Sequence, residues 1–376
     1  MSYKNVLIVG LGTIGEPLAF LLLRTKEQTG LGKIMIHKNT PRSEDAPTLA
    51  ELNREGAELV AYSDEKTREG FKEVLSGRGF GVAYDLEEAL GLADVVIDCT
   101  EEEVAMELLE KYYSPAFEKK KTMGFIAQGS AKGFGKPFAY TINDEALEPG
   151  KDRFIQVVSC NTHQILCLLK TLIFNSRVTM ADFEEAEFTL FRRASDVPQS
   201  RGAIWGTRLG RASGKKYHPK YGAHQPADAL RVLSTIGIKD LWIHGTESVV
   251  NNPFMHTARF DFRVKTKLNT ADVWDLFAAN PLISRTQYTD NNMIFYKGCS
   301  RGHRSRILNQ TVAVIPSLEA VEWKDGLTKI CGGCFTPQDG NSLLSSVAAM
   351  LWLIDPQTYK QKMLSFYREP FLLSEI

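Results

Sequence analysis

The sequence predicts an α/β protein with two domains, the first built on a parallel sheet and the second an α+β domain on a mostly antiparallel sheet. The chain has 376 residues, more than a single hydrophobic core usually serves. Its first part alternates strand-like and helix-like segments, as parallel sheets covered by helices do. After Cys160, segments alternate apolar and polar residues, which is typical of a half-exposed antiparallel sheet. We expect the first domain at 1–158 plus 340–376 and the second at 159–339.

The elements follow from their periodicity along the chain. In the first part, strands are expected at 5–10, 33–38, 81–85, 94–100 and 123–129, and helices at 13–24, 64–75, 86–92 and 101–113. In the second part, strands are expected at 181–191, 257–264 and 309–316. A final segment, 341–354, is a helix so apolar that it must be buried, and we place it against the first domain.

Composition excludes several classes of protein. The chain has 45 basic and 45 acidic residues, so no global charge points to nucleic acid. No signal peptide or membrane-spanning run is visible, and we expect a cytoplasmic protein without a membrane partner. The six cysteines are then reduced thiols rather than a disulfide framework. Cys331 and Cys334 form a single CxxC, which we interpret as a Gly-rich strand or turn, and no metal is expected.

A glycine pattern directly after the first strand indicates a nucleotide site. Residues 10–15 read GLGTIG, a GxGxxG motif that opens a helix. Its glycines allow a tight turn and a close phosphate, and the helix N-terminus binds the pyrophosphate. We therefore expect a Rossmann dinucleotide-binding domain, with contacts from Gly10, Gly12, Thr13, Ile14 and Gly15.

The end of the second strand suggests which dinucleotide is bound. A cofactor of NAD type usually meets an Asp or Glu there, which binds the ribose hydroxyls. Residues 37–41 read HKNTP instead, and the cation of Lys38 would suit a 2'-phosphate. We expect NADP, with NAD also possible. The alternative is that Lys38 is an ordinary solvated lysine.

The turn at 159–162, Ser-Cys-Asn-Thr, places a thiol between a strand-like run and a helical one. A structural cysteine would lie more naturally inside the apolar run. At a helix start, the unpaired amides and the positive end of the helix dipole stabilise a thiolate. Beside a nicotinamide, a thiolate can attack an aldehyde and carry the oxidised acyl group as a thioester. Cys160 is therefore the candidate nucleophile.

Such a nucleophile needs a base, and the seven histidines are candidates. His256 lies at the entrance of an alternating strand, where it can project from a sheet edge into a cleft. His163 lies within one helical turn of Cys160, although side chains at this spacing also meet for structural reasons. His37 belongs to the cofactor region. We select His256.

A basic, Gly-rich segment extends from Arg192 to His224 in a chain of balanced charge. Arginine side chains bind phosphates through paired hydrogen bonds, so this segment suggests phosphate recognition. The alternative, a solvated loop at a subunit contact, fits most of these residues equally well. It fits Arg192 and Arg193 less well, because they directly follow an alternating strand.

Together these residues resemble the archaeal type of phosphorylating glyceraldehyde-3-phosphate dehydrogenase. The likeness covers nearly the whole chain in the same order, and the cysteine motif and the Arg pair are its most specific parts. The matching motifs are GLGTIG at 10–15, DCT at 98–100, QGSAK at 128–132, VVSCNT at 157–162, RRASD at 192–196, FMH at 254–256 and Asn341 before the final helix.

The resemblance implies reversible oxidation of glyceraldehyde 3-phosphate with NAD(P) and inorganic phosphate to an acyl phosphate, in glycolysis or gluconeogenesis, by a cytoplasmic homotetramer. It implies that Cys160 is the nucleophile and His256 the base. The residues implied to border the substrate are Ser159, Asn161, Thr162 and Arg192, with His224 and Gln225 where the family has paired histidines. The residues implied near the cofactor are Lys38, Thr100, Gly129, Arg193 and Asn341.

The chain also departs from the family pattern. After the cysteine motif it has His163-Gln164 where the family commonly has Thr-Gly, and it lacks an Arg shortly after. The loop at 197–223 diverges, and the Gln that the family places ahead of its final helix has no clear counterpart near Cys331 and Cys334. These changes affect the surroundings of the aldehyde and phosphates more than the nucleophile and base.

Two other functions remain open. A related phosphorylating semialdehyde dehydrogenase would keep the mechanism and change the substrate. A non-enzymatic nucleotide-binding or nucleic-acid-binding relative would use the basic loop as its contact surface, and its binding would weaken steeply with salt. The retained thiol and histidine argue against the second alternative, so we do not expect nucleic acid as a partner.

Overall fold

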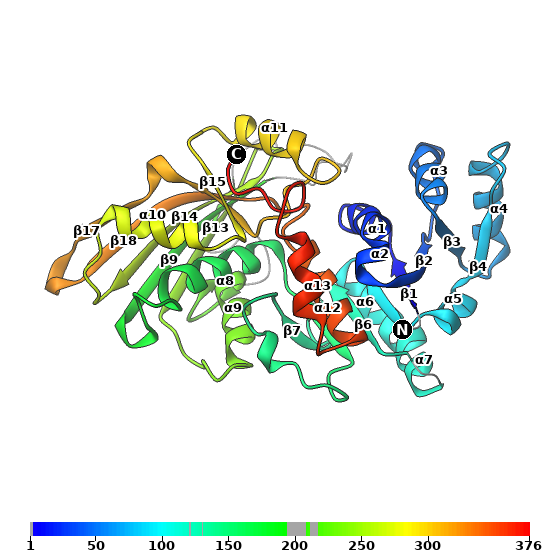
Figure 1. Cartoon of the computed structure of the whole chain (residues 1–376), viewed down its shortest axis with the longest axis horizontal. Helices are drawn as coiled ribbons and strands as arrows, with labels where there is room; N and C mark the ends of the chain where they lie inside the picture. The colour runs from blue at the N-terminus through cyan, green and yellow to red at the C-terminus, as the bar shows by residue number, and fades with distance from the viewer. Residues whose placement is uncertain (1–2, 120–121, 130, 194–207, 211–216) are drawn as a thin grey trace. The chain divides into compact units, whose positions relative to one another are not determined.

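The structure is a computed structural model that describes residues 3–119, 122–129, 131–193, 208–210 and 217–376 (Figure 1). The chain forms two compact units. The first unit comprises Met1–Phe138, Leu147–Val157 and Ser345–Ser365, and the second comprises Ala139–Ala146, Val158–Leu344 and Phe366–Ile376. Residues 139–146, 158, 340–344 and 366–376, which we assigned to the first domain, pack with the second unit.

The first unit contains a parallel sheet, as predicted. Its described residues form eight strands in the order β4-β3-β2-β1-β5-β6-β8-β7, and every neighbouring pair is parallel. The strands are β1 (Lys4–Val9), β2 (Leu31–His37), β3 (Ala57–Ala61), β4 (Val82–Asp85), β5 (Val95–Asp98), β6 (Gly124–Gln128), β7 (Lys136–Phe138) and β8 (Phe154–Val157). The chain reverses direction across the sheet between β1 and β5, which is where such folds bind nucleotides.

Helices cover both faces of this sheet. Along β3, Leu59 and Ala61 pack with α3 and α4, whereas Val60 points to the opposite face and belongs to the core formed with α5 and α6. The helices are α1 (Gly15–Arg24), α2 (Lys26–Thr29), α3 (Ala46–Arg54), α4 (Glu65–Val74), α5 (Leu86–Leu92), α6 (Glu102–Leu108), α7 (Ser114–Lys119), α12 (Leu343–Ile354) and α13 (Tyr359–Met363), with a π-helical turn, η2 (Leu109–Tyr113), after α6. The fold class predicted for the first domain is therefore confirmed.

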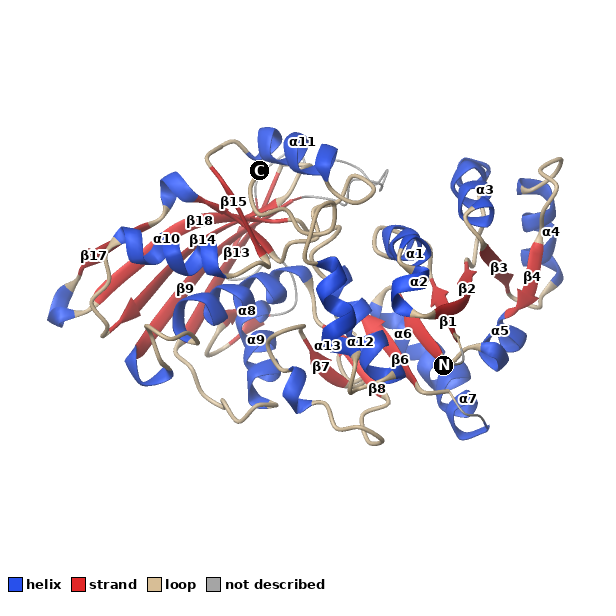
Figure 2. Cartoon of the chain, in the orientation of Figure 1, coloured by secondary structure: helices blue, strands red, loops and turns tan. Residues whose placement is uncertain are grey.

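The second unit contains a mixed sheet whose neighbours are mostly antiparallel (Figure 2). Its order is β11-β12-β13-β9-β14-β18-β16-β15, with β10 beside β13 and β17 beside β18. The parallel pairs are β12–β13, β9–β13 and β15–β16. The strands are β9 (Phe183–Arg193), β10 (Arg208–Gly210), β11 (Tyr217–His218), β12 (Gly222–Ala223), β13 (Ile243–Val250), β14 (His256–Val264), β15 (Ile283–Thr286), β16 (Thr311–Val314), β17 (Glu319–Glu322) and β18 (Thr328–Thr336).

Helices pack on this second sheet and complete its core. Helix α8 (Cys160–Ile173) contacts β18, α9 (His224–Ser234) and α10 (Thr270–Ala279), and α11 (Asn291–Arg301) follows β15. The core includes Phe188, Phe260 and Phe262, all of which are almost fully buried. The alternation that predicted β9 and β14 thus places aromatic side chains under the helices.

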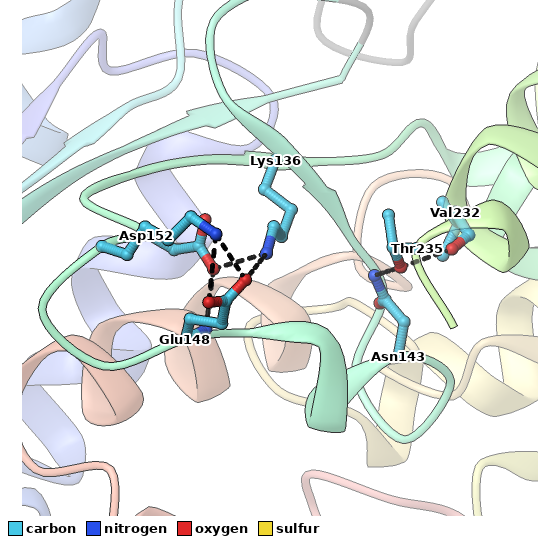
Figure 3. Close-up of polar contacts among 7 residues, drawn as sticks. Lys136, Asn143, Glu148, Asp152, Val232 and Thr235 are labelled. Atoms are coloured by element: carbon cyan, nitrogen blue, oxygen red, sulfur yellow. Dashed lines mark hydrogen bonds and ion pairs between the residues drawn. The ribbon is translucent and has the colours of Figure 1, made fainter. Parts of the chain in front are cut away.

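The segment from β7 to β8 is fixed by polar contacts within each unit. In the first unit, Lys136 Nζ lies 2.6 Å from Asp152 Oδ2 and 3.7 Å from Glu148 Oε1 (Figure 3). In the second unit, Asn143 Nδ2 donates a 2.9 Å hydrogen bond to the Thr235 hydroxyl, which donates to the carbonyl of residue 232.

No helix in the described ranges is long and apolar enough to cross a membrane.

Candidate active site

The glycine-rich loop of the first unit joins β1 to α1. Gly10 has a φ of +90°, and a Cβ there would lie 2.9 Å from Thr100 Cγ2. A Cβ on Gly15 would lie 1.9 Å from the Gly10 carbonyl oxygen, so both positions require glycine. Among the described residues, no atom lies within 4 Å of the place that a Cβ on Gly12 would occupy. The loop, which residues 13–14 connect to α1, therefore fits the pyrophosphate of a dinucleotide.

Two other predicted cofactor residues follow β5, which neighbours β1, and β6, which is the next strand of the sheet. After β5, the N–H and hydroxyl of Thr100 donate hydrogen bonds of 2.8 and 2.6 Å to Asp98 Oδ1, and Tyr113 donates one of 2.6 Å to Oδ2. Burial raises the pKa of the Asp98 carboxyl, against the opposing effect of these hydrogen bonds. After β6, the carbonyl of Gly129 accepts a 2.9 Å hydrogen bond from Gln156. These residues share the carboxyl edge of the parallel sheet with the glycine loop.

Lys38 directly follows β2 and is paired with a carboxylate. Its Nζ atom lies 3.1 Å from Oδ2 of Asp45, the last residue of the 3-10 turn η1 (Ser43–Asp45). The same oxygen accepts the main-chain N–H of Arg42 at 2.8 Å. The loop therefore presents both a cation, which suits a 2'-phosphate, and a carboxylate, which suits ribose hydroxyls. The sequence analysis had singled out the cation of Lys38 but not the carboxylate of Asp45.

Cys160 is the first residue of α8 and is half-buried. Ser159 precedes the helix in an extended conformation, and its hydroxyl lies 2.9 Å from the hydroxyl of Thr162. The thiol therefore lies at the N-terminus of a helix of 14 residues, where the main-chain amides and helix dipole favour a thiolate.

His256 is the first residue of β14, and its side chain is buried. Its Nδ1 atom accepts a 2.9 Å hydrogen bond from the main-chain N–H of Arg193, the last residue of β9. Its own main-chain N–H donates to Gln338 Oε1 at 3.2 Å. Burial lowers the pKa of His256 well below its usual value, and the nearby cations of Arg192 and Arg193 lower it further. The ring is therefore neutral at physiological pH.

Two contacts connect the start of α8 with the end of β18 and the residues that follow it, beside the start of β14. Thr336 lies opposite His256 in the β14–β18 ladder, and its hydroxyl donates a 3.3 Å hydrogen bond to Asn161 Oδ1. The side chain of Asn341 donates a 2.9 Å hydrogen bond to the Cys160 carbonyl. The structure thus brings the predicted nucleophile and histidine to the same part of the second unit, together with Asn161 and Asn341.

Two predicted substrate residues, one near the end of β9 and one on α9, converge on a buried carboxylate. Arg192 Nη1 lies 2.8 Å from Glu247 Oε1, and the amide of Gln225 donates to Oε2 of the same side chain. Glu247 is 2% exposed, whereas Arg192 is 37% exposed. His224 Nε2 lies 4.0 Å from Asp228 Oδ2. Sequence reasoning missed Glu247, although its inward phase in the alternating strand at 243–250 was a usable signal.

Arg193 occupies a buried ion pair. Its Nη2 and Nη1 atoms lie 2.7 and 3.2 Å from the two carboxylate oxygens of Asp339, and Nη1 also donates to the Phe254 carbonyl. The guanidinium is thus held by residues of the second unit, and its expected role near the cofactor stays a prediction. Sequence reasoning missed Asp339 and Gln338 because no local pattern connects 338–339 with the RR motif.

Other candidates of the sequence analysis lie in apolar surroundings. His163 is buried, its Nδ1 atom lies 3.1 Å from the Ser159 carbonyl, and burial lowers its pKa to about 4. Cys331 and Cys334 are buried on β18, and their spacing of three directs the two side chains to opposite faces of the strand. Burial raises the pKa of Cys334 to about 12.

Some predicted site residues lie outside the described residues. They are residue 130 of the QGSAK motif, residues 194–196 of the RRASD motif, and the basic loop at 194–207 and 211–216.

Comparison with known proteins supports the resemblance inferred from the motifs. The chain is 28% identical over 280 residues to the glyceraldehyde-3-phosphate dehydrogenase of Metallosphaera sedula, covering 74% of this chain and 72% of that protein. It is 26% identical over 283 residues to the enzyme of Methanothermus fervidus, covering 74% and 73%. It is 26% identical over 274 residues to that of Methanobrevibacter smithii, covering 72% and 71%. The predicted resemblance to archaeal glyceraldehyde-3-phosphate dehydrogenases is confirmed. No family model matches the chain.

The similarity to archaeal glyceraldehyde-3-phosphate dehydrogenases is not confined to the nucleotide fold. The matched 280 residues exceed the length of either compact unit, so the similarity includes parts of both. A Rossmann fold alone is shared by enzymes of many kinds and would say little about activity. Similarity that extends into the unit with Cys160 and His256 is more informative.

Proposed function

We propose that this protein oxidises glyceraldehyde 3-phosphate with NAD(P) and inorganic phosphate, reversibly, through a thioester on Cys160. The observation that carries this proposal is the placement of Cys160 at the start of α8 in the same part of the second unit as His256. The similarity to archaeal glyceraldehyde-3-phosphate dehydrogenases supports it. In this reaction the thiolate attacks the aldehyde carbon, the carbon is oxidised, and phosphate then displaces the acyl group from sulfur.

Each proposed residue has a chemical role. Ser159, Asn161 and Thr162 border the aldehyde beside the nucleophile, and Asn341 holds the Cys160 main chain. Arg192, which is partly exposed, offers its guanidinium to a substrate phosphate, with His224 and Gln225 nearby along the start of α9. His256 is the imidazole partner of the reacting centre.

For the cofactor we propose NADP, with NAD also used. The contacts would come from Gly10, Gly12, Gly15, the loop residues 13–14, Thr100 and Gly129. A bound oxidised nicotinamide supplies the acceptor for the hydride that leaves the substrate carbon. Lys38 would meet the 2'-phosphate once it separates from Asp45, and Asp45 would offer the ribose contact for NAD. We also propose that the active form is the homotetramer that the resemblance implies, which mass measurement in solution would test.

A second candidate keeps the mechanism but changes the aldehyde. Each of the two arginines that end β9 is already paired with a carboxylate, Arg192 with Glu247 and Arg193 with Asp339. Because the charges of these two cations are compensated in this way, they attract a phosphate less strongly than the arginines alone suggest. This observation favours including semialdehydes without a phosphate in any test of activity.

The proposal is tested by following cofactor reduction with several aldehydes, both cofactors, and with or without inorganic phosphate. We expect phosphate-dependent reduction to be fastest with glyceraldehyde 3-phosphate. Faster oxidation of another aldehyde would replace the substrate and keep the mechanism. Absence of turnover with all aldehydes, together with salt-sensitive binding of nucleic acid, would favour the non-enzymatic alternative.

A further inference from the structure

A small cavity of the second unit lies between the turn at 302–307, which follows α11, and the segment at 337–340, which follows β18. Apolar side chains, among them Phe254, Phe295 and Ile307, form much of its lining. The polar side chains that line it are Cys299, Arg306, Gln338 and Asp339. The cavity offers about 10 Å³ to the centre of a water-sized sphere, which is the room that one water molecule or one monatomic ion needs.

Gln338 supplies a buried donor at this cavity. Its side chain is 7% exposed, and its Oε1 atom accepts the main-chain N–H of His256 at 3.2 Å. Because an N–H needs an acceptor, this contact decides which end of the amide is oxygen and which is nitrogen. The Nε2 atom is therefore the end that remains, and it is buried without a hydrogen-bond partner among the described residues. A buried donor of this kind requires an acceptor.

Arg306 supplies a second donor and a positive charge. Its Nη1 atom donates to the carbonyls of Arg304 and Ser305 at 3.1 and 3.3 Å. Its Nε atom is buried and, within the described ranges, has no hydrogen-bond partner. In the same ranges no carboxylate forms an ion pair with Arg306. The guanidinium thus lacks a counterion on the protein.

Neither acidic group that lines the cavity balances this charge. The carboxylate of Asp339 is paired with Arg193, whose Nη2 atom lies 2.7 Å from it. Burial raises the pKa of Cys299 to about 11, so its thiol is neutral. Two cations and one anion therefore meet at this place, and one positive charge remains in excess.

The position of Arg306 is fixed by a strained turn. Arg304 and Ser305 have left-handed backbones, with φ of +50° and +56°, and a 2.9 Å main-chain hydrogen bond donated by Arg306 closes the turn. Residues other than glycine keep such conformations only where their surroundings hold them. The turn packs closely on the segment after β18, because a Cβ on Gly340 would lie 2.2 Å from the Ile307 carbonyl oxygen. The two donors thus come from two segments in direct contact.

We propose that this cavity binds one small monoanion of halide size, such as chloride, between the amide of Gln338 and the guanidinium of Arg306. The two buried donors need an acceptor, and the uncompensated cation favours a charged acceptor over water. The size of the cavity excludes phosphate and other large anions. A bound anion would connect the two segments and so hold Asp339 in its pair with Arg193. The inference goes beyond the proposed function and does not depend on aldehyde oxidation.

Chloride binding is measured from the line width of the ³⁵Cl magnetic resonance, which increases when chloride exchanges with a protein site. Arg306→Met removes the cation. Gln338→Glu keeps the oxygen that accepts the main-chain N–H and places a carboxylate oxygen where the donor was. Arg78→Met, at an exposed arginine of the first unit, is the matched control. We expect the broadening to decrease in the first two variants and not in the control, and equal broadening in all four proteins would overturn the inference.

Stability gives a second measurement. Urea unfolding of the whole chain is followed in sodium chloride and in sodium gluconate at equal concentration, so that only the size of the anion differs. For a site with a dissociation constant of about 50 mM, the unfolding constant of the wild type falls about tenfold between zero and about 0.5 M chloride, relative to gluconate. Gln338→Glu should lose this dependence, because its own carboxylate replaces the anion. Identical stability of the wild type in the two salts would show that water satisfies the donors, and the inference would fail.

Bromide can locate the site directly. Crystals of the wild type and of Gln338→Glu, grown in sodium bromide, are compared by anomalous scattering. We expect a bromide peak between Gln338 and Arg306 in the wild type that is missing in the variant. Density for water alone at this position in the wild type would refute the inference, whether or not the protein oxidises an aldehyde.

Discussion

His37 should make the stability of the first unit depend on pH. It ends β2, its side chain is 2% exposed, and its ring packs edge-on against Tyr62 with centroids 4.6 Å apart. Neither ring nitrogen has a hydrogen-bond partner among the described residues. Burial lowers its pKa from 6.5 to about 4. We expect His37→Phe, which keeps an aromatic ring and removes the titrating group, to protect the protein against acid.

The magnitude follows from proton linkage. Because the pKa is lowered on folding, the unfolded chain binds more protons, and the wild type loses stability as pH falls from about 6.5 toward 4. One pKa unit corresponds to about 1.4 kcal/mol, so at about pH 4.5 the histidine lowers the free energy of unfolding by about 2.5 kcal/mol relative to about pH 7. The variant should be at least as stable as the wild type at neutral pH, since two unpaired buried nitrogens are removed.

The assay is urea unfolding of the wild type and of His37→Phe at a series of pH values. The quantity of interest is the difference in unfolding free energy between the two proteins, because acid effects from other groups, such as His163, cancel in it. Replacement of the exposed His244 is the control for loss of a histidine as such. A difference that stays constant within about 0.5 kcal/mol from pH 7 to about pH 4.5 would show that His37 is not held neutral by burial, and would refute the reasoning.

Three further predictions concern the site and its supports. Cys160→Ser should abolish cofactor reduction while leaving cofactor affinity, measured by calorimetry, within about twofold, and loss of binding would contradict its role as nucleophile. Lys38→Asp should shift the ratio of kcat/KM from NADP toward NAD by about tenfold or more, since a charge-assisted contact is worth about 1.5–3 kcal/mol, and an unchanged ratio would remove Lys38 from the cofactor site. Asp339→Asn should lower the free energy of unfolding by about 3 kcal/mol because it leaves the buried Arg193 guanidinium uncompensated, whereas Asp240→Asn, at the exposed pair with Lys220, should have a far smaller effect; equal effects in urea unfolding would contradict the buried pair.

Much of the fold could be predicted because local periodicity reflects burial. The alternation at 181–191 and 257–264 matches β9 and β14, and the strongly apolar segment at 341–354 matches α12. Two predicted elements differ from the structure for local reasons. The expected strand at 309–316 ends at Val314, because Pro316 belongs to a 3-10 turn and has no N–H for a sheet. The expected helix at 101–113 becomes π-helical from Leu109, where Tyr113 donates to the buried Asp98.

The parts of the candidate site that are continuous in sequence could be predicted, whereas the contacts between distant segments could not. The glycine loop and the start of α8 are each continuous in sequence, so their geometry could be expected from short motifs. The contacts that fix His256 join three distant segments: Arg193 supplies the N–H to its ring, and Gln338 binds its main chain. Hydrogen bonds across 63 and 82 positions leave no periodic trace, so these contacts of His256 could not be predicted from the sequence.

The two consecutive arginines that end β9 illustrate why neighbouring residues of one motif need not share a role. Successive residues of a strand point to opposite sides, and each arginine meets its own carboxylate: Arg192 pairs with Glu247, and Arg193 with Asp339. Arg193 is 1% exposed, and a buried pair of this kind adds little net stability after desolvation. The main-chain N–H of the same residue donates to Nδ1 of His256. Arg192 keeps 37% of its side chain exposed, so it alone of the two has a guanidinium surface left for a substrate.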